Sequence, residues 1–249
     1  MRVYKGFEEL PQFREAVVTI GSFDGLHRGH LSLLDVVISR AKEIGGESVV
    51  MTFEPHPRVV LGRAEGLRLL TSLEEKIDIL EGIGVDNLII IPFDRDFSRL
   101  SYDEFVKQYL VDRLSIHSLI VGYNHHFGRG NEGSISDFES IAAELCFEII
   151  KVDEWSEDGS ESISSTVVRR MVGQGDMESV ERLLSRPYLI VGHTDGDGRV
   201  WLNDSLKMIP PAGKYNVVIE GRETTITIDD NGVIICDRRN RRVAIEVQR

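Results

Sequence analysis

The sequence predicts an α/β protein, with a doubly wound, Rossmann-like domain followed by a small antiparallel β-barrel-like domain. Over the first 185 residues, short apolar strands alternate with amphipathic helices, which is the rhythm of a parallel sheet covered on both faces. After Tyr188 the chain changes to short β-like runs separated by turn signals. The expected domains are therefore residues 1–185 and 186–249.

The N-terminal elements are recognised by their apolar runs and by the signals at their ends. Gly45-Gly46 stops the first helix, and Ser72-Leu-Glu-Glu75 and Ser101-Tyr-Asp-Glu104 are capping boxes that open the second and third. The expected strands are Glu15–Ile20, Ser48–Phe53, Asn87–Ile91, Ser118–Val121 and Phe147–Val152. The expected helices are Leu31–Ile44, Ser72–Ile83, Ser101–Leu114 and Ser136–Leu145.

The segment between the first strand and the first helix carries the most informative pattern in the chain. It reads Gly21-Ser22-Phe23-Asp24-Gly25-Leu-His27-Arg-Gly29-His30. Backbone N–H groups at a helix start attract anions, and glycines let a polyphosphate approach closely. His27 and His30 share one face of a helical turn, so both imidazoles can donate to phosphate oxygens during nucleotidyl transfer. The alternative is two unrelated surface or core histidines.

Two further loops follow strands, at the sheet edge where ligands bind in doubly wound folds. In Glu54-Pro-His56-Pro57 two prolines fix the backbone, so the segment neither continues a strand nor starts an ordinary helix at once. A rigid turn is the alternative to a ligand contact. The loop Gly122–Gly133 keeps Tyr123 and Phe127 among glycines, which favours a ligand lip over a plain surface loop. Its His125-His126 pair lacks a nearby Cys or carboxylate to complete a metal site.

A fourth candidate element is the hydroxyl-rich helix start near residue 164. Ser164, Ser165 and Thr166 can cap exposed N–H groups and can also hold a phosphate. Arg169 lies three residues after Thr166 on the same helical face, and its alternative role is that of an ordinary solvated arginine. Together with the histidine pair, this helix start predicts a triphosphate clamp.

Composition limits the classes of function. The 249 residues carry a formal net charge of −12, which argues against non-specific binding to nucleic acid or an acidic membrane. It does not argue against ATP, which arrives as a magnesium complex. Only two cysteines are present, Cys146 and Cys236, which suggests a reducing compartment. The N-terminus has no apolar signal region and no run approaches a membrane span, so a cytoplasmic protein is expected.

These motifs together resemble the bacterial bifunctional riboflavin kinase/FMN adenylyltransferase family, also called prokaryotic FAD synthetase. Gly21–His30 is similar to its G-x-F-D-G-V-H-x-G-H element, and Thr52–Pro57 to its T-F-x-P-H-P turn. Val121–Gly128 resembles V-G-x-[DN]-F-x-F-G, although His125 replaces the usual aromatic or apolar residue. Ile163–Arg169 resembles I-S-S-T-x-I-R, and Gly175–Tyr188 resembles the helix and R-P-Y that lead into the kinase module.

The resemblance implies a role for each matching residue. His27 and His30 would bind ATP phosphates and stabilise the transition state, and Asn124 would orient a nucleotide or flavin phosphate. His56 and Pro57 would lie near the flavin. The residues implied to hold the β- and γ-phosphates are Ser164, Ser165, Thr166 and Arg169. The implied reaction is in-line attack of the FMN phosphate on Mg-ATP, without a covalent intermediate.

The last 60 residues depart from the family pattern. Expected strands are Leu189–Val191, Tyr215–Glu220, Glu223–Ile228, Val233–Cys236 and Val243–Val247. The resemblance would make this part the kinase module, but Val200–Pro210 stands where its P-T-A-N element should be. The chain is also several dozen residues shorter than the bifunctional form. We therefore expect a shortened, degenerate barrel without kinase activity. Asp195-Gly-Asp-Gly198 is more typical of a turn than of a calcium loop.

The leading functional hypothesis is an FMN adenylyltransferase with ATP and FMN as substrates, FAD as product and Mg²⁺ as the ion carried by ATP. Alternatives are a bifunctional enzyme that keeps riboflavin kinase activity and a nucleotidyltransferase for another phosphate acceptor. A third is a non-catalytic flavin- or nucleotide-binding regulatory protein. The Thr52–Pro57 turn argues against another acceptor, and a pure binding protein would not require both histidines. The sequence does not indicate an oligomeric state.

Overall fold

The computed structural model describes residues 1–123, 135–153 and 163–248, which divide into two compact units. The first unit contains residues 1–23, 30–65 and the described residues from 80 to 153. The second contains residues 24–29, 66–79 and the described residues from 163 onward. Each unit is made of several separate segments of the chain. The units therefore do not test the predicted domains 1–185 and 186–249, and these domains stay a prediction.

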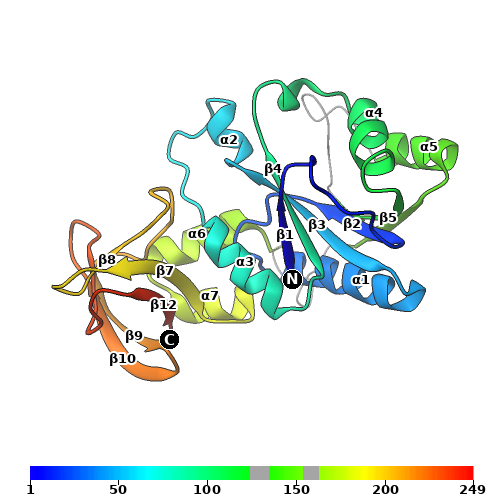
Figure 1. Ribbon diagram of the computed structural model, residues 1–249. Helices are drawn as coiled ribbons and strands as arrows, with labels where there is room; N and C mark the ends of the chain where they lie inside the picture. The colour runs from blue at the N-terminus through cyan, green and yellow to red at the C-terminus, as the bar shows by residue number, and fades with distance from the viewer. Residues whose placement is uncertain (124–134, 154–162, 249) are drawn as a thin grey trace. The chain divides into compact units, whose positions relative to one another are not determined.

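The first unit is built on a six-stranded sheet in the order β1-β4-β3-β2-β5-β6 (Figure 1). All neighbouring strands are parallel. The strands are β1 (Arg2–Lys5), β2 (Ala16–Ile20), β3 (Glu47–Glu54), β4 (Asn87–Pro92), β5 (Ile116–Gly122) and β6 (Glu148–Val152). The predicted Rossmann-like sheet is confirmed. Strand β1 was not expected from the sequence, because four residues with charges at both ends give too short a pattern.

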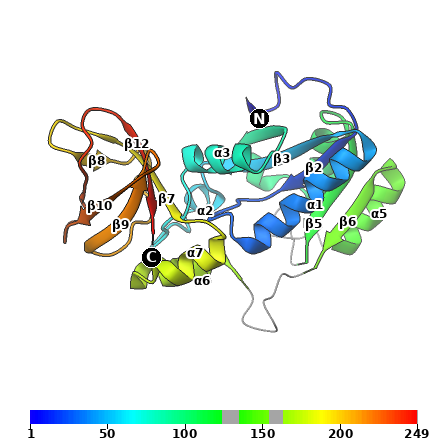
Figure 2. The same ribbon diagram turned by 90° about the horizontal axis from the view of Figure 1, so that it is seen from below.

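Helices lie on both faces of this sheet (Figure 2). Val17 and Ile120 pack with α1 (Arg28–Ile44) on one face. Their strand neighbours Val18 and Leu119 pack on the other face, with α4 (Tyr102–Phe105), the π-helical turn η2 (Val106–Val111) and α5 (Ile135–Leu145). Adjacent residues of a strand point to opposite faces, so these apolar runs are buried on both sides. The remaining helical segments of the first unit are α2 (Pro57–Val60) and η1 (Phe97–Arg99). Helix α3 (Leu73–Gly82) belongs for the most part to the second unit.

Two helical expectations need correction. The Glu54–Pro57 segment does lead directly into a helix, the short α2, because Pro57 occupies its first turn, where no backbone N–H is required. The single helix expected from Ser101 to Leu114 is instead α4 followed by η2. Both predicted capping boxes form: Ser101 with Glu104, and Ser72 with Glu75.

The second unit contains a closed antiparallel barrel in the order β10-β11-β8-β7-β12-β9. Its strands are β7 (Tyr188–Thr194), β8 (Arg199–Trp201), β9 (Gly213–Ile219), β10 (Arg222–Ile228), β11 (Ile234–Ile235) and β12 (Arg242–Val247). The predicted small β barrel is confirmed, with β8 as an additional strand. Helices α6 (Ser165–Gln174) and α7 (Met177–Leu184) share its apolar core. Among the described residues, no helix is both long enough and apolar enough to cross a membrane.

Candidate nucleotide-binding site

The candidate loops follow strands that are neighbours in the sheet. Strand β2 lies between β3 and β5, and the chain continues to β3 and β4 on one side before it returns to β5 on the other. The carboxyl end of β2 is therefore the topological switch point, the usual ligand position in an open α/β sheet. Gly21 immediately follows β2, as the sequence analysis expected.

In the first unit, the beginning of the loop is anchored to β3. Gly21 N donates to the carbonyl oxygen of Met51 at 3.1 Å, and the Thr52 hydroxyl donates to the carbonyl oxygen of Ser22 at 3.4 Å. Phe23 is buried at a positive φ of 46°. A Cβ at Gly21 would lie 3.2 Å from the Phe23 ring, so glycine lets this ring fold back on the loop.

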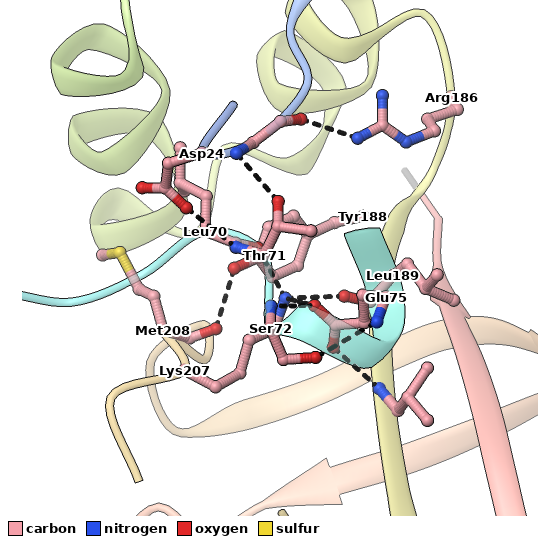
Figure 3. A network of polar contacts seen from close by, with 12 residues as sticks. Asp24, Leu70, Thr71, Ser72, Glu75, Arg186, Tyr188, Leu189, Lys207 and Met208 are labelled. Carbon is pink, nitrogen blue, oxygen red and sulfur yellow. Dashed lines mark hydrogen bonds and ion pairs between the residues drawn. The ribbon is translucent and has the colours of Figure 1, made fainter. Parts of the chain in front are cut away.

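In the second unit, the middle of the loop is held by Thr71 (Figure 3). Gly25 N donates to the Thr71 hydroxyl at 2.8 Å, and Thr71 N donates to Oδ1 of Asp24 at 3.1 Å. The hydroxyl of Ser165, on α6, donates to the carbonyl oxygen of Asp24 at 2.9 Å. Gly25 has φ 85°, and a Cβ there would lie 2.8 Å from Leu70. The positive φ favours glycine at residue 25, and any other side chain there would also have to displace the end of Leu70.

His27 ends the loop just before α1 and is almost fully buried, at 6% exposure. Burial, reinforced by the positive charge of Arg186, lowers the pKa of His27 to about 4. The imidazole is therefore neutral near pH 7, and one ring nitrogen can act as an N–H donor. A Cβ at Gly29 would lie 3.3 Å from His27 Nδ1, so a side chain at residue 29 would crowd the ring.

His30 lies in the first turn of α1, where backbone N–H groups attract anions. It is half-buried, and its ring meets the edge of the Phe23 ring at a centroid distance of 5.4 Å. Both residues belong to the first unit. The buried Phe23 therefore limits the positions that the His30 imidazole can adopt.

Arg169, from α6, contacts the loop rather than open solvent. Its Nη2 donates to Oδ2 of Asp24 at 2.5 Å, and its Nε donates to the carbonyl oxygen of Arg68 at 2.7 Å. Ser164 is the N-cap of α6 and accepts from Val167 N at 3.4 Å. Thr166 is exposed in the first turn of this helix. The structure thus brings Asp24, Ser165 and Arg169 together and leaves Thr166 pointing to solvent.

The other candidate loops are described in part. His56 is the N-cap of α2, where its Nδ1 accepts from Arg58 N at 3.2 Å, and Pro57 opens that helix. The peptide bond between Glu54 and Pro55 is cis. Asn124, together with the rest of 124–134, lies outside the described residues, so its role stays a prediction.

Two residues that hold the loop were not singled out from the sequence. Thr71 precedes the capping box of α3 and carries no motif of its own. Arg186, between α7 and β7, donates to the carbonyl oxygens of Gly25 and Leu26 at 2.6 and 2.9 Å. Arg186 is the first residue of the Arg-Pro-Tyr188 element on which the family resemblance partly rests. That motif was the one feature of the sequence that could have pointed to Arg186.

With this geometry in place, the comparisons with known proteins decide the family. The FAD synthetase family model matches residues 10–167. The chain belongs to the FAD synthetase family. The bifunctional riboflavin kinase/FMN adenylyltransferase of Listeria monocytogenes is 34% identical over 248 residues, which cover 93% of this chain and 76% of that protein. This match confirms the predicted family and its class of enzyme, the nucleotidyltransferases.

Other family members are similar to a comparable degree. The Escherichia coli K12 enzyme of the same name is 34% identical over 204 residues, 80% of this chain and 65% of that protein. The Bacillus subtilis enzyme is 34% identical over 222 residues, 83% of this chain and 68% of that protein. A solved structure described as a macrolide-efflux protein from Streptococcus pneumoniae shares the fold, with a TM-score of 0.82 and 22% identity over 98% of this chain and 96% of that chain.

Proposed function

We propose that this member of the FAD synthetase family is an ATP:FMN adenylyltransferase. The observation that carries the proposal is the loop after β2, whose backbone is fixed by hydrogen bonds. This loop ends at the buried His27, just before α1, and His30 follows in the first turn of that helix. In the proposed reaction an oxygen of the FMN phosphate attacks the α-phosphorus of ATP. The bond from that phosphorus to the β-phosphate oxygen breaks, and pyrophosphate leaves as FAD forms.

The histidines supply charge stabilisation in this proposal. His27 donates one N–H to a phosphate oxygen as negative charge develops, and the bound triphosphate raises its pKa from the low value of the free protein. His30 acts with the N–H groups of the first turn of α1. No side chain forms a covalent bond to the nucleotide, because positioning and electrostatics suffice for this type of transfer.

Arg169 and the start of α6 serve the leaving pyrophosphate in this proposal. Ser164 and Thr166 contribute hydroxyl donors, and Ser165, whose hydroxyl holds Asp24, contributes its backbone N–H at the helix start. The proposal also has Asn124 and the His56-Pro57 turn on the FMN side. Magnesium arrives on ATP, whose phosphate oxygens suit this hard ion. Within the described ranges, no three His, Cys, Asp or Glu side chains cluster as a metal site, and Asp24 is engaged by Arg169.

We further propose that the barrel lacks riboflavin kinase activity. The segment that replaces the P-T-A-N element contributes Lys207 to a buried ion pair with Glu75, at 2.7 Å. A Cβ at Gly198, in the preceding turn, would lie within 2 Å of an Arg239 guanidinium nitrogen, so Arg239 fills the space beside that glycine. Both observations support a structural role for these residues, in place of the nucleotide contacts that the resemblance implies for this part of a kinase module. Because ATP is a substrate, a cytoplasmic location is part of the proposal.

The test is product analysis of the purified protein with Mg-ATP, in parallel reactions with FMN and with riboflavin. We expect FAD from FMN and no FMN from riboflavin. FMN from riboflavin would show a bifunctional enzyme and refute the loss of the kinase. Tight flavin binding without product from either reaction would favour the regulatory binding protein instead.

A further inference from the structure

Arg186 is directed at backbone carbonyls of the loop rather than at a carboxylate. It stands between α7 and β7, where the helical part of the second unit leads into the barrel (Figure 3). Its Nη2 donates to Gly25 O at 2.6 Å, and its Nη1 donates to Leu26 O at 2.9 Å and to Leu184 O at 3.0 Å. One guanidinium therefore ties two consecutive loop carbonyls to the end of α7.

The loop needs such support because its backbone is strained. Leu26 has φ 44°, in the left-handed region that a branched side chain rarely occupies. Such a residue is strained and persists only where its surroundings hold it. Leu26 is fully buried and directly precedes His27, so relaxation of its backbone would move the His27 imidazole.

Three side chains of the second unit make hydrogen bonds to the backbone polar groups around Leu26. Thr71 accepts from Gly25 N, and Ser165 donates to Asp24 O. Arg186 supplies the donors for Gly25 O and Leu26 O. Burial lowers the pKa of Arg186 to about 10, so it stays protonated and can donate throughout the neutral range. Removal of Arg186 would leave two carbonyls without these donors, and a buried carbonyl that loses its donor destabilises the conformation that holds it.

We propose that Arg186 is a positioning residue for adenylyl transfer, because it fixes the Gly25-Leu26 backbone that sets the place of His27. The inference rests on the proposed function, since it concerns the same loop. It also gives the short connection between α7 and β7 a role in holding the loop. Arg186 acts through the loop backbone and is not assigned a contact with substrate.

The experiment compares Arg186→Ala and Arg186→Lys with the wild type in FAD formation, at a temperature at which all three are folded. Arg182→Ala is the matched control, because Arg182 is an exposed arginine of α7. We expect kcat to fall about 100-fold in Arg186→Ala and about 10-fold in Arg186→Lys, which keeps the charge but not the two-pronged donor. The KM for FMN should stay within about twofold, and Arg182→Ala should match the wild type.

Rescue separates positioning from general stability. Guanidinium ion at millimolar concentration should restore part of kcat in Arg186→Ala, whereas methylammonium should not and Arg186→Lys should gain nothing. Wild-type kcat in Arg186→Ala would overturn the proposal. If that variant does not fold, wild-type kcat in Arg186→Lys would overturn it. A loss that guanidinium does not reverse, in a folded protein, would also contradict positioning through these carbonyls.

Failure of the proposed function can be distinguished from failure of the positioning role of Arg186. If the wild type forms no FAD, adenylyl transfer to FMN is refuted, and the backbone amide resonances of Gly25 and His27 then test the role of Arg186. We expect these resonances to shift in Arg186→Ala and to return towards their wild-type positions with guanidinium. Unchanged resonances would overturn the positioning role independently of any activity.

Discussion

Arg169 donates from Nη2 to Oδ2 of Asp24 at 2.5 Å, and this ion pair joins helix α6 to the loop that follows β2. Asp24 is buried, whereas the Arg169 side chain keeps 23% exposure. An arginine that the family resemblance assigns to phosphate binding is thus already engaged with a carboxylate. Its exposed part can still meet an anion while the ion pair holds the loop.

Replacement of Arg169 by Met should affect both nucleotide binding and stability. A charge-assisted hydrogen bond to phosphate is worth about 1.5–3 kcal/mol, so the KM for ATP should rise about tenfold or more. The free energy of unfolding should fall by about 1–3 kcal/mol, because Asp24 loses its partner and the pair is only partly buried. Initial rates and urea unfolding measure the two effects, with exposed Arg170→Met as the control. An unchanged KM with lowered stability would restrict Arg169 to a structural role.

Replacement of His27 by Ala should reduce kcat about 100-fold or more, with a modest change in ATP affinity, because the lost N–H acts mainly in the transition state. His27→Gln retains an N–H donor of different reach and should lose less. His193→Ala, which removes an exposed histidine of the barrel, should leave kcat unchanged. Steady-state kinetics and nucleotide titration separate the two parameters. Wild-type turnover in His27→Ala would contradict the assigned role.

His27 should also make stability depend on pH. Its pKa is about 4 in the folded protein against 6.5 in its ordinary state, so between these values the unfolded chain binds a proton that the native protein does not. Stability is therefore lost as pH falls from about 6.5 to about 4, by about 3 kcal/mol for this residue alone. The comparison is urea unfolding of wild type and His27→Gln at pH 7 and pH 4.5. A constant difference between the two proteins would contradict the low pKa.

The buried pair of Lys207 and Glu75 should be essential for the stability of the second unit. Lys207 Nζ lies 2.7 Å from Glu75 Oε2 and also donates to the carbonyl oxygens of Leu70 and Leu189. Burial lowers the pKa of Lys207, with Glu75 opposing that shift. Lys207→Met leaves a buried carboxylate without its cation and should cost about 3–5 kcal/mol.

The double variant Lys207→Met with Glu75→Gln tests whether that cost comes from the unpaired charge. It should recover part of the loss, and exposed Lys214→Met should be near neutral. Thermal and urea unfolding provide the measurement. Equal losses in the single and double variants would show that packing, rather than the ion pair, dominates.

The elements that the sequence predicted well are those specified by local chemistry. The capping box of Ser101 and Glu104 lies within one helical turn, and the turn-rich C-terminal part forms the expected barrel. The π-helical turn after α4 was not predictable, because the amphipathic pattern from residue 101 to 114 fits one continuous helix equally well. Local patterns determine which element forms, but they do not determine how its helical turns are wound.

The candidate site shows the same limit. The motif residues of the loop were identified from the sequence, but the partners that hold them come from distant parts of the chain. Thr71 contacts Asp24 across 47 residues, and Arg186 contacts Gly25 across 161. Pairings of this kind depend on tertiary packing and leave no spacing pattern in a single sequence. The ion pair of Arg169 with Asp24 was missed for the same reason.

The most direct test of the proposed function is a stoichiometric measurement of adenylyl transfer. Purified wild-type protein and His27→Ala are incubated with Mg-ATP and FMN, and FAD and pyrophosphate are quantified over time. We expect equimolar FAD and pyrophosphate from the wild type, and a rate about 100-fold lower in the folded variant. Pyrophosphate without FAD, or equal rates in the two proteins, would contradict FMN adenylylation by the loop that ends at His27.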